Sequence, residues 1–278
     1  MTVTVASGKG GTGKTLIATS LALSLDEEVQ FVDCDVEEPN AHIFIQPQIY
    51  KKEYVYLPKP IVEDSKCTGC GSCAEICQFN AVAVVKKKVL IFYELCHSCG
   101  ACSLICPENA IFEVDVEKGI LEKGEKGNIE FWHGILTVGE SSPTPIVKAL
   151  KKKINPHKHV IIDSSPGTSC PVVEAVKGSD FAILVTEPTP FGLHDLDLAV
   201  KMCEKLEVKT GVIINRAGKG DEQVETYCKD KKIPILERIP LSRKIAQAYS
   251  KGIPLVKAFP KFRERFFLLW KRINKEEL

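Results

Sequence analysis

The chain has 278 residues, 44% of them hydrophobic and 26% charged, a composition typical of a soluble globular protein. Its formal net charge of +1 gives no electrostatic reason to expect a nucleic acid or an acidic partner. No apolar run approaches the ~20 residues of a membrane span. The opening MTVTVASGKG lacks the basic and apolar segments of a signal peptide, so we expect a cytoplasmic protein.

The first elements along the chain are predicted to form a βαβ unit. Residues 2–6 alternate as a short strand, residues 14–25 carry apolar side chains at helical spacing, and residues 29–35 are typical of a buried strand. A glycine-rich loop separates the first strand from the helix. This order predicts an α/β fold with a mostly parallel sheet flanked by helices.

Composition then changes between residues 58 and 115, which contain eight of the twelve cysteines. Four of these cysteines, with the pattern C-x₂-C-x₂-C-x₃-C, recur 29 residues later, and the flanks CQFNAV (77–82) and CPENAI (106–111) repeat as well. We interpret residues 58–115 as a small inserted α+β domain with two pseudo-symmetric halves. The host domain is then divided into residues 1–57 and 116–278, with a hairpin or linker expected over 116–135.

Beyond the insert the α/β pattern resumes. Strands are predicted at 158–167, 181–188, 209–218 and 233–240, and helices at 170–179 and 193–206. Residues 259–278 predict a final amphipathic helix whose apolar face is formed by Phe262, Phe266, Leu269, Trp270 and Ile273. We favour packing of this helix on the sheet, and its basic side chains leave a membrane surface as the alternative.

Residues 8–15, GKGGTGKT, match the phosphate-binding pattern G-x-x-x-x-G-K-[ST] between a predicted strand and helix. Glycines let backbone N–H groups turn onto phosphate, and the helix N-terminus adds a partial positive charge. Lys14 is predicted to reach the β- and γ-phosphates and Thr15 to bind Mg²⁺. The alternative is a tight glycine turn, which the strand–loop–helix context disfavours. The other loop residues predicted to bind nucleotide are Gly8, Gly10, Gly11, Thr12 and Gly13.

Three aspartates follow predicted strands. Asp163 ends an apolar strand and precedes Gly167, the position where P-loop proteins hold Mg²⁺, usually through water. Asp33 and Asp35 end the strand VQFVDCD (29–35). Ligands of open α/β sheets gather at the carboxyl ends of strands, so the three carboxylates are expected to converge. The alternative for Asp33 or Asp35 is a turn or cap aspartate.

Residues 9–15 resemble the deviant Walker A motif of the MinD/Mrp/ParA superfamily of P-loop ATPases. VDCDVEEPNAH (32–42) and IIDSSPG (161–167) are similar to its switch I and switch II, and the match covers the chain outside the insert. INR (214–216) and IPL (239–241) resemble its two adenine-side loops. The resemblance implies ATP or ADP with Mg²⁺ as ligands, and it assigns Asn215, Arg216 and Pro240 to nucleotide binding.

In that family the early lysine of the motif crosses a dimer interface to the partner's nucleotide. The resemblance therefore implies that Lys9 is this signature lysine, and that ATP joins two copies into a homodimer that hydrolysis releases. It also implies that Asp35 orients or activates the attacking water and that Asp33 assists at Mg²⁺, beside Thr15 and Asp163. Lys9, Lys14 and Asp35 are thus predicted to be catalytic, and a solvent-facing role is the alternative for Lys9.

The two cysteine runs match the bacterial two-cluster ferredoxin pattern, in which the fourth ligand of each cluster comes from the other run. One 4Fe–4S cluster is predicted on Cys67, Cys70, Cys73 and Cys106, and a second on Cys96, Cys99, Cys102 and Cys77. Zinc is the alternative, but zinc sites lack the third regularly spaced cysteine.

An ATPase with such an insert resembles the MinD-superfamily ATPases that contain a ferredoxin domain. Our first hypothesis is an ATPase whose dimer closure is coupled to electron transfer through the clusters to a redox partner. The second is an ATP-dependent scaffold or carrier for iron–sulfur clusters or for a partner protein, with structural or sensory clusters. The remaining cysteines form no C-x₂-C, which counts against cluster delivery, and Cys170 is expected to be buried.

Overall fold

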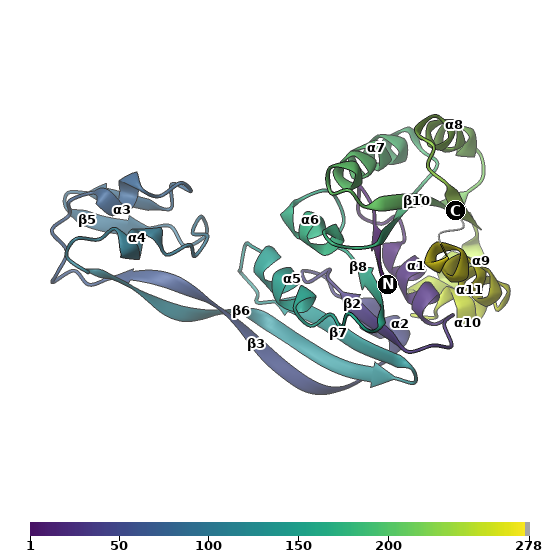
Figure 1. Ribbon diagram of the computed structural model, residues 1–278, viewed down its shortest axis with the longest axis horizontal. Coiled ribbons are helices and arrows are strands. Elements are labelled where there is room, and N and C mark those ends of the chain that lie inside the picture. The colour runs from purple at the N-terminus through teal and green to yellow at the C-terminus, as the bar shows by residue number, and fades with distance from the viewer. Residues whose placement is uncertain (276–278) are drawn as a thin grey trace. The chain divides into compact units, whose positions relative to one another are not determined.

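The computed structural model describes residues 1–275 and divides into two compact units (Figure 1). The α/β unit comprises residues 1–53, 121–135 and the chain from residue 143 onward. The cysteine-rich unit comprises residues 54–120 and 136–142. The sequence predicted an insert over 58–115. The cysteine-rich unit begins earlier and ends later, because the two long strands β3 and β6 each continue from one unit into the other.

A nine-stranded sheet has the order β11-β10-β9-β1-β8-β2-β7-β6-β3. Every neighbouring pair from β11 to β7 is parallel, which confirms the predicted mostly parallel α/β fold. The strands are β1 (Thr2–Ala6), β2 (Val29–Asp33), β3 (Gln48–Val62), β6 (Ile111–Lys126), β7 (Ile129–Leu136), β8 (His159–Asp163), β9 (Phe181–Thr186), β10 (Lys209–Ala217) and β11 (Ile235–Pro240).

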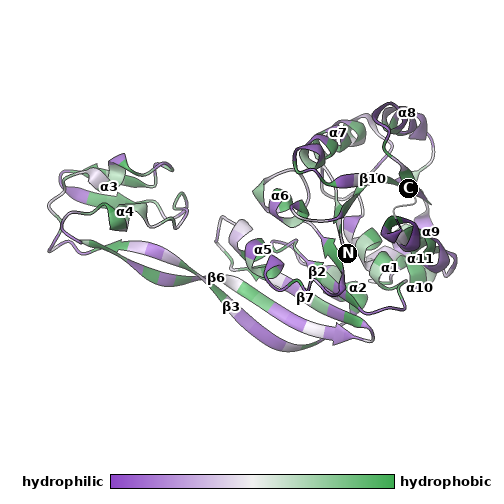
Figure 2. Cartoon of the chain, viewed as in Figure 1, coloured by the Kyte–Doolittle hydropathy of each residue, from purple (hydrophilic) through white to green (hydrophobic). Residues whose placement is uncertain are grey.

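The helices of the α/β unit cover both faces of its sheet. They are α1 (Lys14–Ala22), α2 (Ala41–Ile45), α5 (Thr144–Lys151), α6 (Cys170–Val176), α7 (Pro190–Lys205), α8 (Asp221–Lys231), α9 (Arg243–Ser250), α10 (Leu255–Ala258) and α11 (Lys261–Asn274). Side chains alternate across a strand, so Ile183 of β9 packs with α1 and α11 whereas Leu184 packs with α6 and α7. The central strands are apolar on both faces, as a sheet covered on both sides requires (Figure 2).

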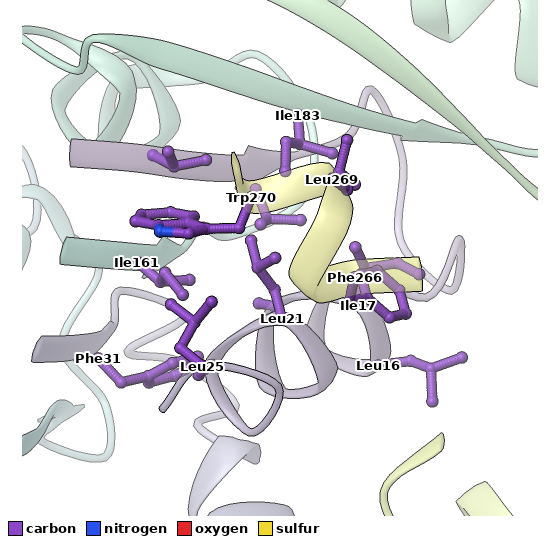
Figure 3. Packing of buried hydrophobic residues seen from close by; sticks show 14 of the residues in the cluster. Leu16, Ile17, Leu21, Leu25, Phe31, Ile161, Ile183, Phe266, Leu269 and Trp270 are labelled. Atoms are coloured by element: carbon purple, nitrogen blue, oxygen red, sulfur yellow. The ribbon is translucent and has the colours of Figure 1, made fainter. Parts of the chain in front are cut away.

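The C-terminal helix α11 packs into this core, as we predicted. All five residues of its apolar face are buried, and Trp270 lies close to Leu21 and Ile161 (Figure 3). The predicted end of this helix, residues 276–278, lies outside the described residues. Within residues 1–275, no helix is long and apolar enough to cross a membrane.

The segment between the insert and the host forms a hairpin, one of the two forms expected for it. Strands β6 and β7 are joined by Gly127 and Asn128, and Gly127 has φ +58°. Strand β3 has no counterpart among the predicted elements. Residues 48–52 at its start have the sequence QIYKK and are all exposed. This stretch lacks the alternation of apolar and polar residues from which a strand is predicted.

The cysteine-rich unit repeats one local fold twice. Each half carries a one-turn helix, α3 (Ser72–Glu75) or α4 (Ala101–Leu104), and the halves share the antiparallel pair β4 (Val82–Val85) and β5 (Lys88–Ile91). Gly71 and Gly100 precede the two helices, each with positive φ, because a left-handed residue is needed where the cysteine loop turns into the helix. The backbone thus has the pseudo-symmetry that the sequence repeat predicted.

Candidate functional site

The glycine-rich loop of residues 8–15 links β1 to α1 and is closely packed at two of its glycines. A Cβ atom on Gly8 would lie 2.0 Å from the backbone oxygen of Asp195. A Cβ on Gly13, whose φ is +95°, would lie 2.4 Å from Nδ2 of Asn215. These two positions therefore admit only glycine in this backbone path.

Charged side chains meet where β2 and β8 end, beside the start of α1. Asp33 and Asp163 are neighbours in register across the parallel β2–β8 pair, and both are fully buried. Lys14 and Thr15 are each 7% exposed. Asp35 follows Asp33 by two residues, so all three predicted carboxylates converge with the loop lysine.

Burial favours the protonated form of these carboxyl groups. It raises the pKa of Asp163 to about 7, although the Thr15 hydroxyl and the Lys14 ammonium oppose that rise. Burial likewise raises the pKa of Asp35 to about 6, and it raises the pKa of Asp33, with repulsion from Asp163 as the second cause. For Lys14, burial lowers the pKa, which the three carboxylates oppose.

The carboxylate of Asp163 is suited to a divalent cation. Neither of its oxygens has a hydrogen-bond partner in the part of the chain that the structure describes, although both are buried. A buried carboxylate without a hydrogen bond is costly even with the Lys14 ammonium nearby, and a bound cation lowers that cost. The Thr15 hydroxyl lies next to it, so the predicted Mg²⁺ ligands Thr15 and Asp163 are brought together.

Asp33 instead holds its own loop. Its Oδ1 accepts the N–H of Asp35 at 3.0 Å and its Oδ2 accepts the N–H of Ala41 at 3.1 Å. The loop of residues 34–40 between β2 and α2 is therefore shaped by this carboxylate. In this structure Asp33 organises the predicted switch I, whereas Asp163 retains free oxygens.

The two predicted switch segments are hydrogen-bonded to each other. The N–H of Cys34 donates to the backbone oxygen of Asp163 at 2.8 Å, and the Ser165 hydroxyl donates to the backbone oxygen of Cys34 at 3.0 Å. The N–H of Gly167 donates to the backbone oxygen of Ser7 at 2.9 Å. A displacement of either switch segment would thus also move the other segment and the start of the glycine-rich loop.

The residues assigned to the adenine side reach the same loop from β10. Asn215 donates from Nδ2 to the backbone oxygen of Thr12 at 2.7 Å, and Arg216 donates to the backbone oxygen of Gly11 at 3.2 Å. Pro240 lies one strand away at the end of β11, in register with Ala217 of β10. All three assigned residues therefore lie at the carboxyl edge of the sheet.

Glu187 is a site residue that the sequence reasoning missed. Its carboxylate lies 2.7 Å from Nη1 of Arg216 and 3.9 Å from Nζ of Lys9. The side chain of Lys9 is 32% exposed, whereas that of Glu187 is 11% exposed. Its place in the sequence could have indicated this role. Glu187 directly follows the apolar strand β9 and therefore lies at the same edge of the sheet as the aspartates.

The eight clustered cysteines line two cavities of the cysteine-rich unit. Cys67, Cys70, Cys73 and Cys106 line the first. Cys77, Cys96, Cys99 and Cys102 line the second. Each cavity thus takes three cysteines from one run and the last cysteine of the other, which is the grouping we predicted for the two clusters.

Backbone geometry around these thiols suits a bound inorganic cluster. The N–H of Ala81 points to Sγ of Cys77, and the N–H of Ala110 points to Sγ of Cys106, each at 3.3 Å. Among residues 1–275, no three His, Cys, Asp or Glu side chains converge closely enough to hold a single metal ion. The thiols surround a space instead, as a multi-atom cluster needs.

Our prediction for Cys170 was wrong. Its side chain is exposed, whereas Cys34, Cys203 and Cys228 are buried. The reason is its position at the start of α6, three residues after the end of the predicted switch II and just before the buried Pro171 and Val172. Within this first turn the side chains of Pro171 and Val172 face the core, whereas that of Cys170 does not.

Comparison with known proteins places the chain in a family. Residues 3–255 match the family model described as the CobQ/CobB/MinD/ParA nucleotide binding domain, and the chain belongs to this family. An uncharacterized protein of Methanocaldococcus jannaschii is 35% identical over 223 residues, which cover 78% of this chain and 79% of that protein. The iron-sulfur cluster carrier protein of Pyrococcus abyssi is 24% identical over 278 residues, which cover 91% of this chain and 78% of that protein.

Solved structures show the same fold. The septum site-determining protein MinD of Pyrococcus horikoshii, complexed with Mg-ADP, superposes with a TM-score of 0.62 at 20% identity. The superposition covers 100% of this chain and 98% of that structure. The predicted resemblance to MinD and ParA proteins is therefore confirmed at the level of family and fold.

Proposed function

We propose that this protein is an ATP-hydrolysing iron–sulfur protein that acts as a carrier or scaffold for iron–sulfur clusters. The observation that carries the proposal is the pair of cysteine-lined cavities, located in the chain between β2 and β8, whose ends supply Asp33 and Asp163. Movement of either strand end during the ATP cycle would act on a segment that holds the cysteines.

The comparisons support the carrier hypothesis over electron transfer. Relatives from Pyrococcus abyssi and Methanocaldococcus jannaschii have the name iron-sulfur cluster carrier protein. Nothing comparable supports coupling to a redox partner. Cys170 adds an exposed thiol at the start of α6, three residues after the predicted switch II.

The nucleotide chemistry follows from the loop and its neighbours. Backbone N–H groups of residues 8–13 would hold the phosphates, Lys14 would neutralise their charge, and Thr15 with Asp163 would hold Mg²⁺. Asp35, whose pKa burial raises to about 6, would orient or activate the attacking water. These assignments use only groups that already converge.

The cluster assignments follow from the cavities. Cys67, Cys70, Cys73 and Cys106 would hold one 4Fe–4S cluster, and Cys77, Cys96, Cys99 and Cys102 the other. Bound clusters of this type store electrons and can be passed between thiolate sites. The backbone N–H groups directed at sulfur would stabilise the negative charge of the thiolates.

Dimerisation is part of the proposal. Lys9 lies close to Glu187 of its own chain, which holds it beside the loop. In the ATP-bound homodimer this lysine would leave Glu187 and contact the nucleotide of the partner subunit. The charge of the γ-phosphate would favour that exchange, because a phosphate offers more negative charge to an ammonium group than one carboxylate does.

The test is cluster transfer from the anaerobically reconstituted protein to an apo-protein that needs a 4Fe–4S cluster for its own activity. Wild-type protein should bind roughly eight irons and transfer them at a rate that differs at least severalfold between ATP and ADP. Zinc binding, or the absence of iron and sulfide, would disprove the cluster assignment. One-electron reduction of an acceptor, with every iron retained by the donor, would restore the electron-transfer hypothesis.

A further inference from the structure

The two cysteine halves differ at one buried charge. The repeat of 29 residues pairs Lys59 with Lys88, each eight residues before the first cysteine of a run. Lys88, at the start of β5, is exposed. Lys59, in β3, is only 5% exposed. The pseudo-symmetry of the backbone is therefore broken in its electrostatics.

Lys59 is directed at the turn that leads into the second cysteine run. Its Nζ donates to the backbone oxygen of Tyr93 at 3.1 Å and to the backbone oxygen of Cys96 at 3.0 Å. The Tyr93 hydroxyl donates in return to the backbone oxygen of Pro60 at 3.1 Å. Three hydrogen bonds thus join residues 59–60 to the turn of residues 93–96.

The segment of residues 136–142 makes a further contact with the turn of residues 93–96. The Ser141 hydroxyl donates to the backbone oxygen of Glu94 at 3.3 Å. The same segment pairs Glu140 with Lys118, a lysine of β6 that is also 5% exposed. Lys59, Lys118, Glu140 and Glu94 line one cavity of about 260 Å³ beside the turn.

The hydrogen bonds of Lys59 fix the position of its ammonium group, but their acceptors do not neutralise its charge. Backbone oxygens are neutral acceptors, whereas Lys118 has the carboxylate of Glu140. A positive charge in a poorly solvated position acts more strongly on nearby groups than a solvated one. Its effect on the first cysteine of the second run, Cys96, has no equivalent from the exposed Lys88.

We infer that Lys59 is a positioning residue for the second cysteine site and makes the cluster at that site easier to reduce than the cluster at the first. The inference rests on the proposed cluster binding. Reduction adds one electron to a cluster, and a buried ammonium group nearby stabilises the added negative charge. The two sites are therefore unequal despite their matching cysteine patterns.

The experiment is a redox titration of the reconstituted full chain with dithionite and mediator dyes, followed by electron paramagnetic resonance. Lys59→Gln should make one-electron reduction of one cluster roughly tenfold less favourable, which is a shift of about 59 mV to lower potential. Lys59→Arg keeps the positive charge, so its reduction potential should lie close to that of the wild type. Lys88→Gln is the matched control and should change neither cluster by more than about twofold.

The affected cluster is assigned in a Cys106→Ala background, where only the second site keeps four cysteines. The Lys59→Gln shift should persist there. Loss of the second cluster alone in Lys59→Gln, restored by Lys59→Arg, also supports the positioning role. Two clusters with unchanged potentials in Lys59→Gln would overturn the inference while leaving the proposed function intact. A wild-type protein without clusters would instead reject the proposed function.

Discussion

At the scale of single residues, the buried carboxylate of Asp163 has the largest expected effect on stability and cation binding. Its buried carboxylate faces Asp35 and Lys14 without a hydrogen-bond partner among the described residues. A carboxylate placed this way costs free energy, and a bound cation that neutralises it lowers that cost. Such residues are typical of binding sites rather than of cores.

This position predicts an inverted pH dependence of stability. Between about pH 4 and pH 7 the folded, metal-free protein holds protons on Asp163 and Asp35 more tightly than the unfolded chain does, because both pKa values are raised. The free energy of unfolding should therefore fall as the pH rises from 4 to 7, by on the order of 3 kcal/mol. Urea unfolding at pH 5 and pH 7.5 measures it.

Two controls accompany that measurement. Asp163→Asn should reduce the pH dependence to the part contributed by Asp35 and raise the stability of the metal-free protein at pH 7.5. Saturating Mg-ATP should stabilise the wild type more at pH 7.5 than at pH 5, since cation binding needs the ionised carboxylate. A stability that rises steadily from pH 4 to 7 in the metal-free protein would contradict the raised pKa values.

The pair of Lys9 and Glu187 predicts opposite effects of two substitutions. Lys9→Ala should lower ATP-dependent dimerisation and hydrolysis at least tenfold while nucleotide still binds the monomer. Glu187→Gln removes the carboxylate that holds Lys9 and should make dimerisation more favourable, by roughly twofold to tenfold, as expected for a partly exposed ion pair.

Analytical ultracentrifugation with a non-hydrolysable ATP analogue measures both variants. Lys201→Gln is a suitable control, because this exposed lysine of α7 makes an ion pair with Asp197 away from the loop. Normal dimerisation and hydrolysis by Lys9→Ala would show that the lysine does not cross the interface.

At the scale of elements, α11 shows how amphipathicity decides position. Phe266 is fully buried against α1, whereas Leu268, two residues later, is 51% exposed. Phe266→Ala should lower the free energy of unfolding by about 3–5 kcal/mol, whereas Leu268→Ala should change it by less than about 1 kcal/mol. Equal effects in chemical denaturation would mean that α11 is not packed as described.

Each cysteine cavity takes its fourth cysteine from the other half of the cysteine-rich unit. Cys106 follows α4 of the second half yet lines the first cavity with Cys67, Cys70 and Cys73. Cys106→Ala should therefore lower the iron content from roughly eight to roughly four per chain. The surviving cluster should be the one that Lys59→Gln shifts, and survival of the other would show that each run holds its own cluster.

At the scale of the whole molecule, the two units differ in how they are stabilised. The core of the α/β unit covers both faces of a large sheet, whereas the cysteine-rich unit has a small hydrophobic cluster around Cys73, Val82 and Ile111. Small cores of this kind usually need metal sites or other cross-links to fold stably.

Removal of iron should therefore unfold one unit and spare the other. Both tryptophans, Trp132 and Trp270, belong to the α/β unit, so their fluorescence reports on it alone. Chelation should increase amide hydrogen exchange across residues 63–111 at least tenfold while tryptophan fluorescence and ATP binding change little. Loss of ATP binding on chelation would indicate that the units do not fold independently.

The sequence alone determined those features that depend on neighbouring residues. Strand, glycine loop and helix follow one another directly, and hydrophobic periodicity marked both the parallel strands and the buried face of α11. The regular cysteine spacing likewise determined the pseudo-symmetric halves. Strand β3 was missed because the exposed residues at its start give no periodic signal.

Only the tertiary structure decided which distant groups meet. Glu187 reaches Lys9, Asp33 turns back to its own loop, and Cys170 remains exposed at a helix start. Lys59 and Lys88 occupy equivalent positions in the repeat, yet only the first is buried against the cysteine turn. The physical reason is that burial and charge pairing depend on what packs from elsewhere in the chain, and spacing along the sequence does not record it.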